Sequence, residues 1–305
     1  MFARRLRSMA RKALIFETWN IGVCDIAIDK LVDPTVQPIP TWLPKPSNVF
    51  AYYADPFALT DTHIICEYLD TTTTNRGTIA VLKWDAATNT IDSTEILKQP
   101  WHLSYPFTFH FAGQNWCVVE ENKFGSTHIY IYRVAGHAVL QERTIVHDLP
   151  AIDPTLCQWN GKWWMFCTLS DNNRNNIDLY LWYAETPLSE WRPHPNNPVK
   201  TDATSARPGG TPFVLDGRLY RPAQDCSTTY GGSISLMEVV RLDATGFEER
   251  LVRKISPIAP YVSGIHTLSA FGKRTLIDGK KHLFTPSSAI QRFHAPLRGP
   301  SGSRH

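Results

Sequence analysis

Two aspartates and a histidine in similar sequence contexts are the residues of this chain best suited to proton chemistry. Asp55 and Asp153 each precede a proline, and His266 lies in a Gly-Ile-His-Thr stretch. Aspartate and histidine are residue types that act as general acids and bases in enzymes. A single Asp-Pro pair is also a common turn dipeptide, so the spacing of these residues decides how they are interpreted.

The two Asp-Pro pairs belong to a phrase that recurs five times along the chain. Its repeat positions are 50, 48, 58 and 55 residues apart, and they are Pro56, Pro106, Pro154, Pro212 and, in the fifth copy, Thr267. A repeat of this length, built from short strands and turns, is typical of a β-propeller. We therefore predict an all-β chain that forms a single five-bladed β-propeller over residues 13–290.

Each copy of the repeat contains about four predicted strands. In the third copy, Asn160-Gly161 is a strong signal for a two-residue hairpin turn, and Asp216-Gly217 and Gly113-Gln114 mark the same turn in the fourth and second copies. Residues 13–23 read as a strand pair, and we expect an N-terminal strand to complete the last blade and cover its edge. Residues 33–46 would then connect to the first blade.

The first strand of each propeller blade lines the central channel, where ligands usually bind. The residues that directly precede the repeat positions should therefore form a ring around the channel, and these are Asp55, Tyr105, Asp153, Thr211 and His266. Carboxylates are rarely buried unless they are paired or functional. The ring favours a functional site, with simple turn formation by Asp-Pro as the alternative.

The phrases around Asp55, Asp153 and His266 resemble those of the five-bladed glycosidases of family 43 and their relatives, the invertases, levansucrases and furanosidases. This resemblance implies that Asp55 is the base or nucleophile and that Asp153 adjusts the pKa of the acid. It places His266 near a central metal or water. We expect no cofactor and assign no metal ligands, although a central calcium ion near His266 is compatible with the resemblance.

The resemblance breaks down at the fourth blade, where the family has its general acid, a glutamate. The matching segment before Gly210 contains no acidic residue. Glycoside hydrolysis normally needs two carboxyl groups, so Glu120, Glu121 or Glu67 would have to supply the proton. The alternative is that these glutamates are solvated strand ends or structural ion pairs.

A closer resemblance is to the N-terminal propeller domain of plant glucosamine inositolphosphorylceramide transferases and its free-standing bacterial counterparts. The shared phrases include Trp-Asn-Ile-Gly at 19–22, Arg-Pro-Gly-Gly at 207–210 and Gly-Ile-His-Thr at 264–267. In the plant proteins a separate domain carries glycosyl transfer, and we do not expect that domain within these 305 residues. The resemblance implies a role on cell-surface polysaccharide or glycolipid, with a glycosyltransferase as partner.

The predicted site residues fall into two groups. Arginine can clamp a carboxylate or phosphate, and aromatic faces can stack on sugar rings. The candidate catalytic residues are Asp55, Asp153, Glu120 and Glu121, and the candidate substrate contacts are Glu67, Tyr105, Arg207, Thr211, Arg221 and His266. Two functions fit them. One is a glycosidase-like enzyme that hydrolyses or transfers a furanosyl or cell-surface glycan, and the other is a non-catalytic sugar-binding or scaffold propeller that acts with a glycosyltransferase.

Composition limits the other function classes. The net charge is +3, but residues 1–12 carry five basic residues, which leaves about −2 for the rest (3 − 5), so a nucleic-acid-binding face is not expected. No apolar run has the length of a secretory signal or membrane span. We expect residues 1–12 to be a flexible basic end and residues 291–305 a disordered tail. The six cysteines lack disulfide or metal spacing, which predicts buried packing residues and a cytoplasmic location.

Overall fold

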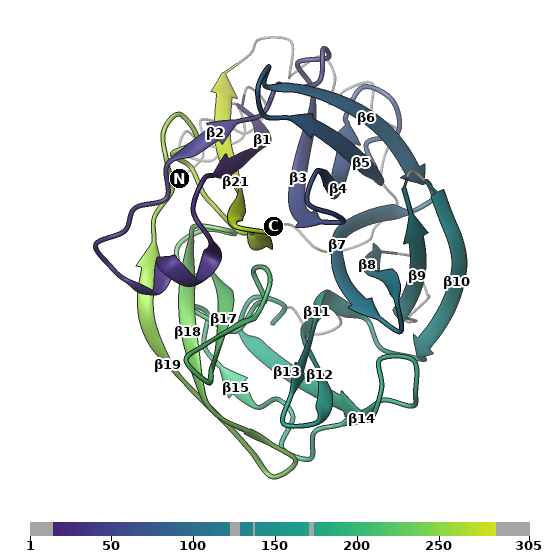
Figure 1. Ribbon diagram of the computed structural model, residues 1–305, viewed down its shortest axis with the longest axis vertical. Helices are drawn as coiled ribbons and strands as arrows, with labels where there is room; N and C mark the ends of the chain where they lie inside the picture. The colour runs from purple at the N-terminus through teal and green to yellow at the C-terminus, as the bar shows by residue number, and fades with distance from the viewer. Residues whose placement is uncertain (1–14, 123–128, 137, 171–173, 285–305) are drawn as a thin grey trace, which may run out of the picture.

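The computed structural model describes residues 15–284 apart from 123–128, 137 and 171–173, and these residues form five β-sheets around a central axis (Figure 1). Each sheet is one blade, so the predicted all-β five-bladed propeller is confirmed. Its helical content in the described part is one short 3-10 helix, η1 (Ile28–Val32), and no helix there has the length and hydropathy of a membrane span. The predicted basic end, residues 1–12, and the predicted tail, residues 291–305, lie outside the described residues.

The blades follow one another along the chain. The first contains β3 (Ala51–Ala58), β4 (His63–Asp70), β5 (Gly77–Asp85) and β6 (Thr90–Leu97). The second contains β7 (His102–Phe111), β8 (Gln114–Asn122), β9 (Ile129–Ala135) and β10 (Ala138–Val146). The third contains β11 (Ala151–Trp159), β12 (Lys162–Leu169), β13 (Asp178–Ala184), β14 (Arg192–Pro193) and β15 (Lys200–Thr201). The fourth contains β16 (Phe213–Leu215), β17 (Arg218–Asp225), β18 (Ser233–Asp243) and β19 (Gly246–Ile255).

The fifth blade is built from both ends of the described chain. β20 (Leu268–Phe271) and β21 (Arg274–Phe284) are joined by β1 (Ile15–Cys24) and β2 (Pro40–Trp42), in the order β2-β1-β21-β20. β1 pairs antiparallel with β21 along its whole length, and Figure 1 shows the two strands side by side. The predicted N-terminal closure is confirmed. Where a strand pair was predicted, the structure has one continuous strand, β1. The predicted connector, residues 33–46, contains β2, which pairs with the other edge of β1.

The hairpin turns show why the chain reverses where it does. Asn160-Gly161 and Asp216-Gly217 have positive φ at both central residues, between 49° and 76°, as a type I′ turn requires. In the second blade the turn residues are Ala112-Gly113, one position earlier than predicted, with φ of 52° and 72°. Glycine adopts the left-handed backbone without steric cost, and asparagine and aspartate adopt it more readily than other residues.

The second strands of the blades are buried on both faces by neighbouring blades. The predicted packing role of three repeated cysteines is confirmed, since Cys66 in β4, Cys117 in β8 and Cys167 in β12 are all buried and unpaired. Ile21 of β1 is fully buried and packs in one cluster with Leu276 of β21 and residues of the first blade. This cluster joins the last blade to the first.

Replacing Ile21 with alanine tests whether packing of the N-terminal strand holds the ring closed. Ile21→Ala should lower the free energy of unfolding by about 2–5 kcal/mol, the usual cost of emptying a buried isoleucine site. Urea titration followed by tryptophan fluorescence measures the change. Val49→Ala, at a site that is 66% exposed, should change it by less than about 0.5 kcal/mol. Equal effects of the two substitutions would contradict this account.

Candidate active site

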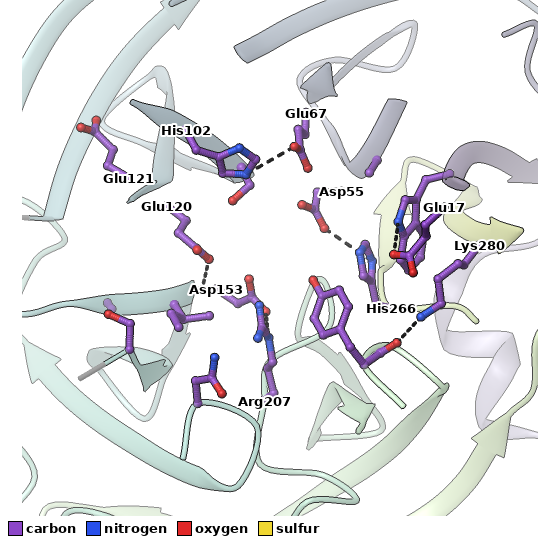
Figure 2. A pocket seen from close by; sticks show the side chains of 18 of the residues that line it. Glu17, Asp55, Glu67, His102, Glu120, Glu121, Asp153, Arg207, His266 and Lys280 are labelled. Carbon is purple, nitrogen blue, oxygen red and sulfur yellow. Dashed lines mark hydrogen bonds and ion pairs between the residues drawn. The ribbon is translucent and has the colours of Figure 1, made fainter. Parts of the chain in front are cut away.

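A cavity of about 570 Å³ opens at the propeller axis and is lined by residues of all five blades. Figure 2 shows its carboxyl groups arranged around an open centre. Its acidic lining residues are Glu17, Asp55, Glu67, Glu120, Glu121 and Asp153, and its basic ones are His102, Arg207, His266 and Lys280. The predicted central funnel is therefore present, and it is rich in groups that can exchange protons.

A β-bulge repeats in three inner strands. Asp55, Tyr105 and Asp153 have φ of 51°, 47° and 51°, and in each case this residue and the following proline face a single residue of the second strand. Non-glycine residues rarely adopt this left-handed backbone, and bulges next to active sites re-aim side chains and backbone groups. Three matching outliers mark the ring as a specialised part of the fold.

The bulge turns each backbone N–H toward an acid of the preceding blade. The N–H of Asp55 donates to Asp278 Oδ2 at 3.3 Å, and that of Tyr105 donates to Asp55 Oδ2 at 3.2 Å. The N–H of Asp153 donates to Glu120 Oε2 at 3.0 Å. Each acid is thus held by a main-chain group of its neighbour, which fixes the blades relative to one another.

Asp55 is buried but well supplied with partners. Besides the Tyr105 N–H, its Oδ1 accepts the Thr267 hydroxyl at 3.1 Å and lies 3.5 Å from His266 Nδ1. Burial raises the pKa of Asp55 to about 6, while the nearby His266 charge and the Thr267 hydroxyl oppose that rise. Asp55 can therefore accept or release a proton near neutral pH.

His266 is held against Asp278, which was not among the predicted site residues. His266 Nδ1 lies 2.5 Å from Asp278 Oδ2, and the imidazole stacks on Trp19 with centroids 3.8 Å apart. Burial alone would lower the pKa of His266, but the charges of Asp278 and Asp55 outweigh it and raise that pKa. The pKa of Asp278 is lowered because the His266 charge and its hydrogen bonds outweigh the cost of burial.

Asp153 pairs with an arginine at the point where the resemblance implied an acid. Arg207 Nε donates to Asp153 Oδ2 at 2.6 Å, and Gln224 Nε2 donates to the same oxygen at 2.6 Å. Arg207 also lies over the Tyr230 ring, 4.8 Å from its centroid. The fourth blade therefore contributes a cation that neutralises Asp153.

The two consecutive glutamates of β8 point in different directions. Glu120 accepts the Asp153 N–H, whereas the carboxylate of Glu121 accepts hydrogen bonds from Trp101 and Tyr132 and points away in Figure 2. This follows from the alternation of side chains along a strand. Burial first and the Asp153 charge second raise the pKa of Glu120 well above its ordinary value. Of these two glutamates, Glu120 is the one that contacts Asp153, whereas the carboxylate of Glu121 is bound by Trp101 and Tyr132.

Glu67 lies beside Asp55 and faces a histidine of the next blade. His102 Nε2 is 3.4 Å from Glu67 Oε1, and the N–H of Gly77 donates to His102 Nδ1 at 2.8 Å, so Nδ1 acts as the acceptor. Glu67 Oε1 is buried without a hydrogen bond. Burial, followed by the Asp55 charge, raises the pKa of Glu67 well above its ordinary value.

Three predicted substrate contacts, Tyr105, Arg221 and Thr211, do not line the cavity. Tyr105 keeps its place in the ring, but its buried hydroxyl accepts the Gly210 N–H at 2.9 Å and bonds Thr155. Arg221 is fully buried and pairs with Glu249 at 2.7 Å.

Thr211 is displaced because the fourth blade follows a different backbone path. Gly210, at φ 134°, pairs in parallel with Leu268, where a Cβ would meet the Leu268 oxygen at 1.9 Å. Thr211 N then donates to Leu268 O at 3.0 Å. The backbone of the fourth blade is thereby joined to that of the fifth, and Arg207 takes the ring position instead.

Sequence comparison of the copies could have identified one of the missed residues. Glu67 and Glu120 occupy matching positions in the second strands of the first two blades, opposite Ala54 and Ser104. Extending that match to β21 leads to Asp278. Trp19, Gln224 and Tyr230 reach the site through packing and loop geometry, for which the repeat holds no signal.

The oxygen and nitrogen atoms of Asp55, His266 and Asp278 lie within 4.8 Å of one another, which raises the question of a metal ion. A carboxylate has about four acceptor positions, and calcium takes six to eight oxygen ligands. Asp278 already accepts four protein donors: the N–H groups of Asp55, His266 and Thr267, and His266 Nδ1. The group does not fit a calcium ion in this arrangement.

Comparison with known proteins agrees with this architecture. A protein-family model described as "Glucosamine inositolphosphorylceramide transferase 1, N-terminal" matches residues 34–257. Glucosamine inositolphosphorylceramide transferase 1 of Oryza sativa subsp. japonica is 34% identical over 215 residues, and that of Arabidopsis thaliana is 30% identical over 214 residues. Both matches cover 67% of this chain, but only 28% and 27% of the relatives, so the chain spans under a third of their length.

Solved structures with a similar fold include glycoside hydrolases. A family 117 glycoside hydrolase produced by the marine bacterium Zobellia galactanivorans has a TM-score of 0.54 and 11% identity, covering 87% of this chain and 94% of that one. A thermostable family-43 glycoside hydrolase has a TM-score of 0.50 and 12% identity, covering 67% of this chain and 75% of that one. At these identities the likeness concerns the fold.

The pH dependence of stability tests the buried state of Glu67. Its pKa in the fold is raised above the unfolded value, so its contribution is fully present below the unfolded pKa and is lost as pH rises through the folded pKa. Glu67→Gln should therefore melt higher than the wild type at pH 9 but not at pH 4, by roughly 2–4 °C for each kcal/mol. Scanning fluorimetry from pH 4 to 9 measures this difference.

Glu185→Gln is the matched control for that experiment, since Glu185 is an exposed carboxylate paired with Lys162. Its melting temperature should follow the wild-type curve at every pH. Parallel curves for wild type and Glu67→Gln would show that Glu67 does not carry an ionisation cost.

Proposed function

The chain belongs to the family of the N-terminal domain of glucosamine inositolphosphorylceramide transferase 1, and on that premise we propose that its axial cavity binds a sugar and cleaves or transfers a glycosidic bond by acid–base chemistry. The family makes the domain a carbohydrate-related propeller. The curated relatives are named for glucosamine and inositolphosphorylceramide, so an amino sugar on a glycolipid headgroup is the first substrate class to test.

One observation carries the proposal, namely the contrast between the surroundings of Asp55 and those of Glu120. Asp55 has a backbone donor, a hydroxyl donor and an imidazole beside its oxygens, all of which stabilise its charge. Glu120 accepts the Asp153 N–H and lies beside the negative charge of Asp153, which disfavours its ionised form. Two carboxyl groups whose environments separate their pKa values suit the roles of base and acid.

The chemistry proceeds with a balanced proton transfer. Glu120 gives its proton to the glycosidic oxygen as the bond from that oxygen to the anomeric carbon breaks. In one route Asp55 takes a proton from the water or acceptor hydroxyl that bonds to the anomeric carbon, and before the next turnover Asp55 releases that proton to solvent while Glu120 takes one up. In the other route Asp55 bonds to the anomeric carbon as the leaving group departs, and a water or acceptor hydroxyl then displaces Asp55 while ionised Glu120 takes its proton. The anomer first released distinguishes the two routes.

The remaining cavity residues position these two groups and the ligand. Asp153 favours protonated Glu120 through its charge, and Arg207 pairs with Asp153 and holds it in place. Glu67 and His102 lie next to Asp55 and are proposed to contact sugar hydroxyls. Neutral polar donors and acceptors in such a cavity provide orientation.

The domain is proposed to act beside a glycosyltransferase. Support comes from its relatives, in which the matched region is about 28% of a longer protein named as a transferase. A cytoplasmic location remains a prediction from the six unpaired cysteines. Co-purification of a tagged chain from its own host, scored for glycosyltransferases, tests the partnership.

Sugar binding without bond cleavage is the second candidate function. It is favoured by Arg207, which stands in the fourth-blade segment where the resemblance to family 43 implied a general acid. Its guanidinium pairs with Asp153. Calorimetric binding of a sugar by a protein that cleaves no glycoside of the test panel would select this function.

Leaving-group dependence tests the acid and base roles. On p-nitrophenyl glucosaminides, galactosides and arabinofuranosides, Asp55→Asn should lower kcat by about 10³-fold or more for every substrate cleaved. Glu120→Gln should lower kcat about 10²- to 10⁴-fold for alkyl glycosides, whose leaving oxygen needs a proton. It should cost less than about 10-fold for dinitrophenyl glycosides, whose leaving group departs without one.

Glu185→Gln serves again as the carboxylate-to-amide control and should keep wild-type kcat. Full activity of Asp55→Asn would exclude Asp55 as the base. An equal loss for both kinds of leaving group in Glu120→Gln would exclude Glu120 as the acid.

The pH profile of kcat/KM should be bell-shaped. The rate should rise through about pH 6 as Asp55 ionises, since its pKa is raised to about 6. It should fall at higher pH as Glu120, whose pKa is raised well above the ordinary range, loses its proton. Initial rates from pH 4 to 10 measure both limbs, and a rising limb below pH 4.5 would contradict the assignment of Asp55.

A further inference from the structure

A cluster of two aspartates and one histidine, of which Asp55 and His266 line the cavity, is almost completely shielded from water. Asp55, Asp278 and His266 expose 6%, 0% and 3% of their surfaces. Two carboxylates close together in a buried site repel each other, so the cluster needs a positive charge to remain ionised. The question is which group supplies that charge.

Asp278 leaves no acceptor position for an ion. Its Oδ1 accepts the N–H groups of His266 at 2.9 Å and Thr267 at 3.0 Å. Its Oδ2 accepts the N–H of Asp55 at 3.3 Å and faces His266 Nδ1 at 2.5 Å. Four donors fill the acceptor capacity of a carboxylate.

The orientation of His266 requires a proton on Nδ1. This nitrogen faces three oxygens: Asp278 Oδ2 at 2.5 Å, Thr267 Oγ1 at 3.1 Å and Asp55 Oδ1 at 3.5 Å. The Thr267 hydroxyl donates its own proton to Asp55, so its oxygen is free to accept. Stacking on Trp19 and an edge contact with Tyr230 hold the ring in this orientation.

We propose that a doubly protonated His266, held by Asp278, is the resident cation at the axis of this propeller and takes the place of a metal ion beside Asp55. The charge state of His266 is independent of the proposed function, whereas its effect on the base rests on that function. Asp278 and His266 are then positioning residues for Asp55.

The surroundings of the ring support this assignment. The titratable and charged groups that face it or its stacking partner are Asp278 and Lys280 of β21, Asp55 of β3, Asp153 of β11, Glu17 of β1 and Tyr230 of the loop after β17. The charges of Asp278 and Asp55 raise the pKa of His266 despite its burial. Lys280 is directed to the Tyr230 carbonyl and lies 5.2 Å from the Trp19 ring centroid, so it pairs with neither aspartate.

Ring-nitrogen NMR of ¹⁵N-histidine-labelled protein tests the proposal directly. Both nitrogens of His266 should show imidazolium shifts at pH 7, and the spectrum should be the same with EDTA as with 5 mM calcium. The melting temperature should likewise shift by less than 1 °C between these conditions. A neutral ring at pH 7, or a calcium-dependent ring spectrum or melting temperature, would overturn the proposal.

Two variants separate the charge from simple packing. Asp278→Asn should lower the pKa of His266 by at least 1 unit in the same NMR experiment, and if this variant does not fold, the wild-type spectrum decides. His266→Gln should move the acid limb of kcat/KM upward by at least 1 pH unit, because ionised Asp55 loses its positive neighbour. An unmoved limb in an active His266→Gln protein would overturn the positioning role.

His110→Gln, at an exposed site in β7, is the control and should leave both the limb and the spectrum of His266 unchanged. If the wild-type protein cleaves no glycoside, the proposed function fails, but the ring spectrum still decides the charge state of His266.

Discussion

The buried carboxyl groups at the axis impose the constraint on which the rest of this structure depends. A carboxylate out of water must receive hydrogen bonds or a counter-charge, and here it receives them from a neighbouring blade. Asp278 of the fifth blade is held by the Asp55 N–H, Asp55 by the Tyr105 N–H, and Glu120 by the Asp153 N–H. Asp153 in turn is held by Arg207 of the fourth blade. Four of the five blade junctions therefore carry an acid and its donor.

The left-handed bulge makes this arrangement possible. A regular strand would direct the N–H of each ring residue into its own sheet, whereas the bulge turns it toward the adjacent blade. The cost of the unusual backbone at Asp55, Tyr105 and Asp153 is offset by the bonds that it allows. Between the fourth and fifth blades, backbone pairing of Gly210 with Leu268 joins the two sheets instead. The acids at three blade junctions are thus held by one repeated local geometry.

The repeat allowed much of this to be predicted from sequence. The period located the blades, and aligned Asp-Pro pairs located Asp55 and Asp153, because equivalent residues in a propeller return to the same distance from the axis. The direction of a side chain is not contained in the period. Tyr105 therefore points into the core, and Thr211 leaves the ring because Gly210 approaches Leu268 too closely for the common path. Asp278 lies in the second strand of the fifth blade, at the position that Glu67 and Glu120 occupy in the first two blades. Only a comparison of the second strands would have identified it.

Closure by β1 makes completion of the cavity depend on pairing between two segments that lie far apart in the sequence. Trp19 of β1 covers His266, and both come to the axis only when β1 has paired with β21, whose residues lie at the opposite end of the described sequence. Contacts between distant segments form late, because the loop that they close must first be ordered. During synthesis the four preceding blades can emerge and stack while the fifth still lacks its last strand. A chain that ends before β21 would therefore contain Asp55, Glu120 and Asp153 without a complete axial cavity.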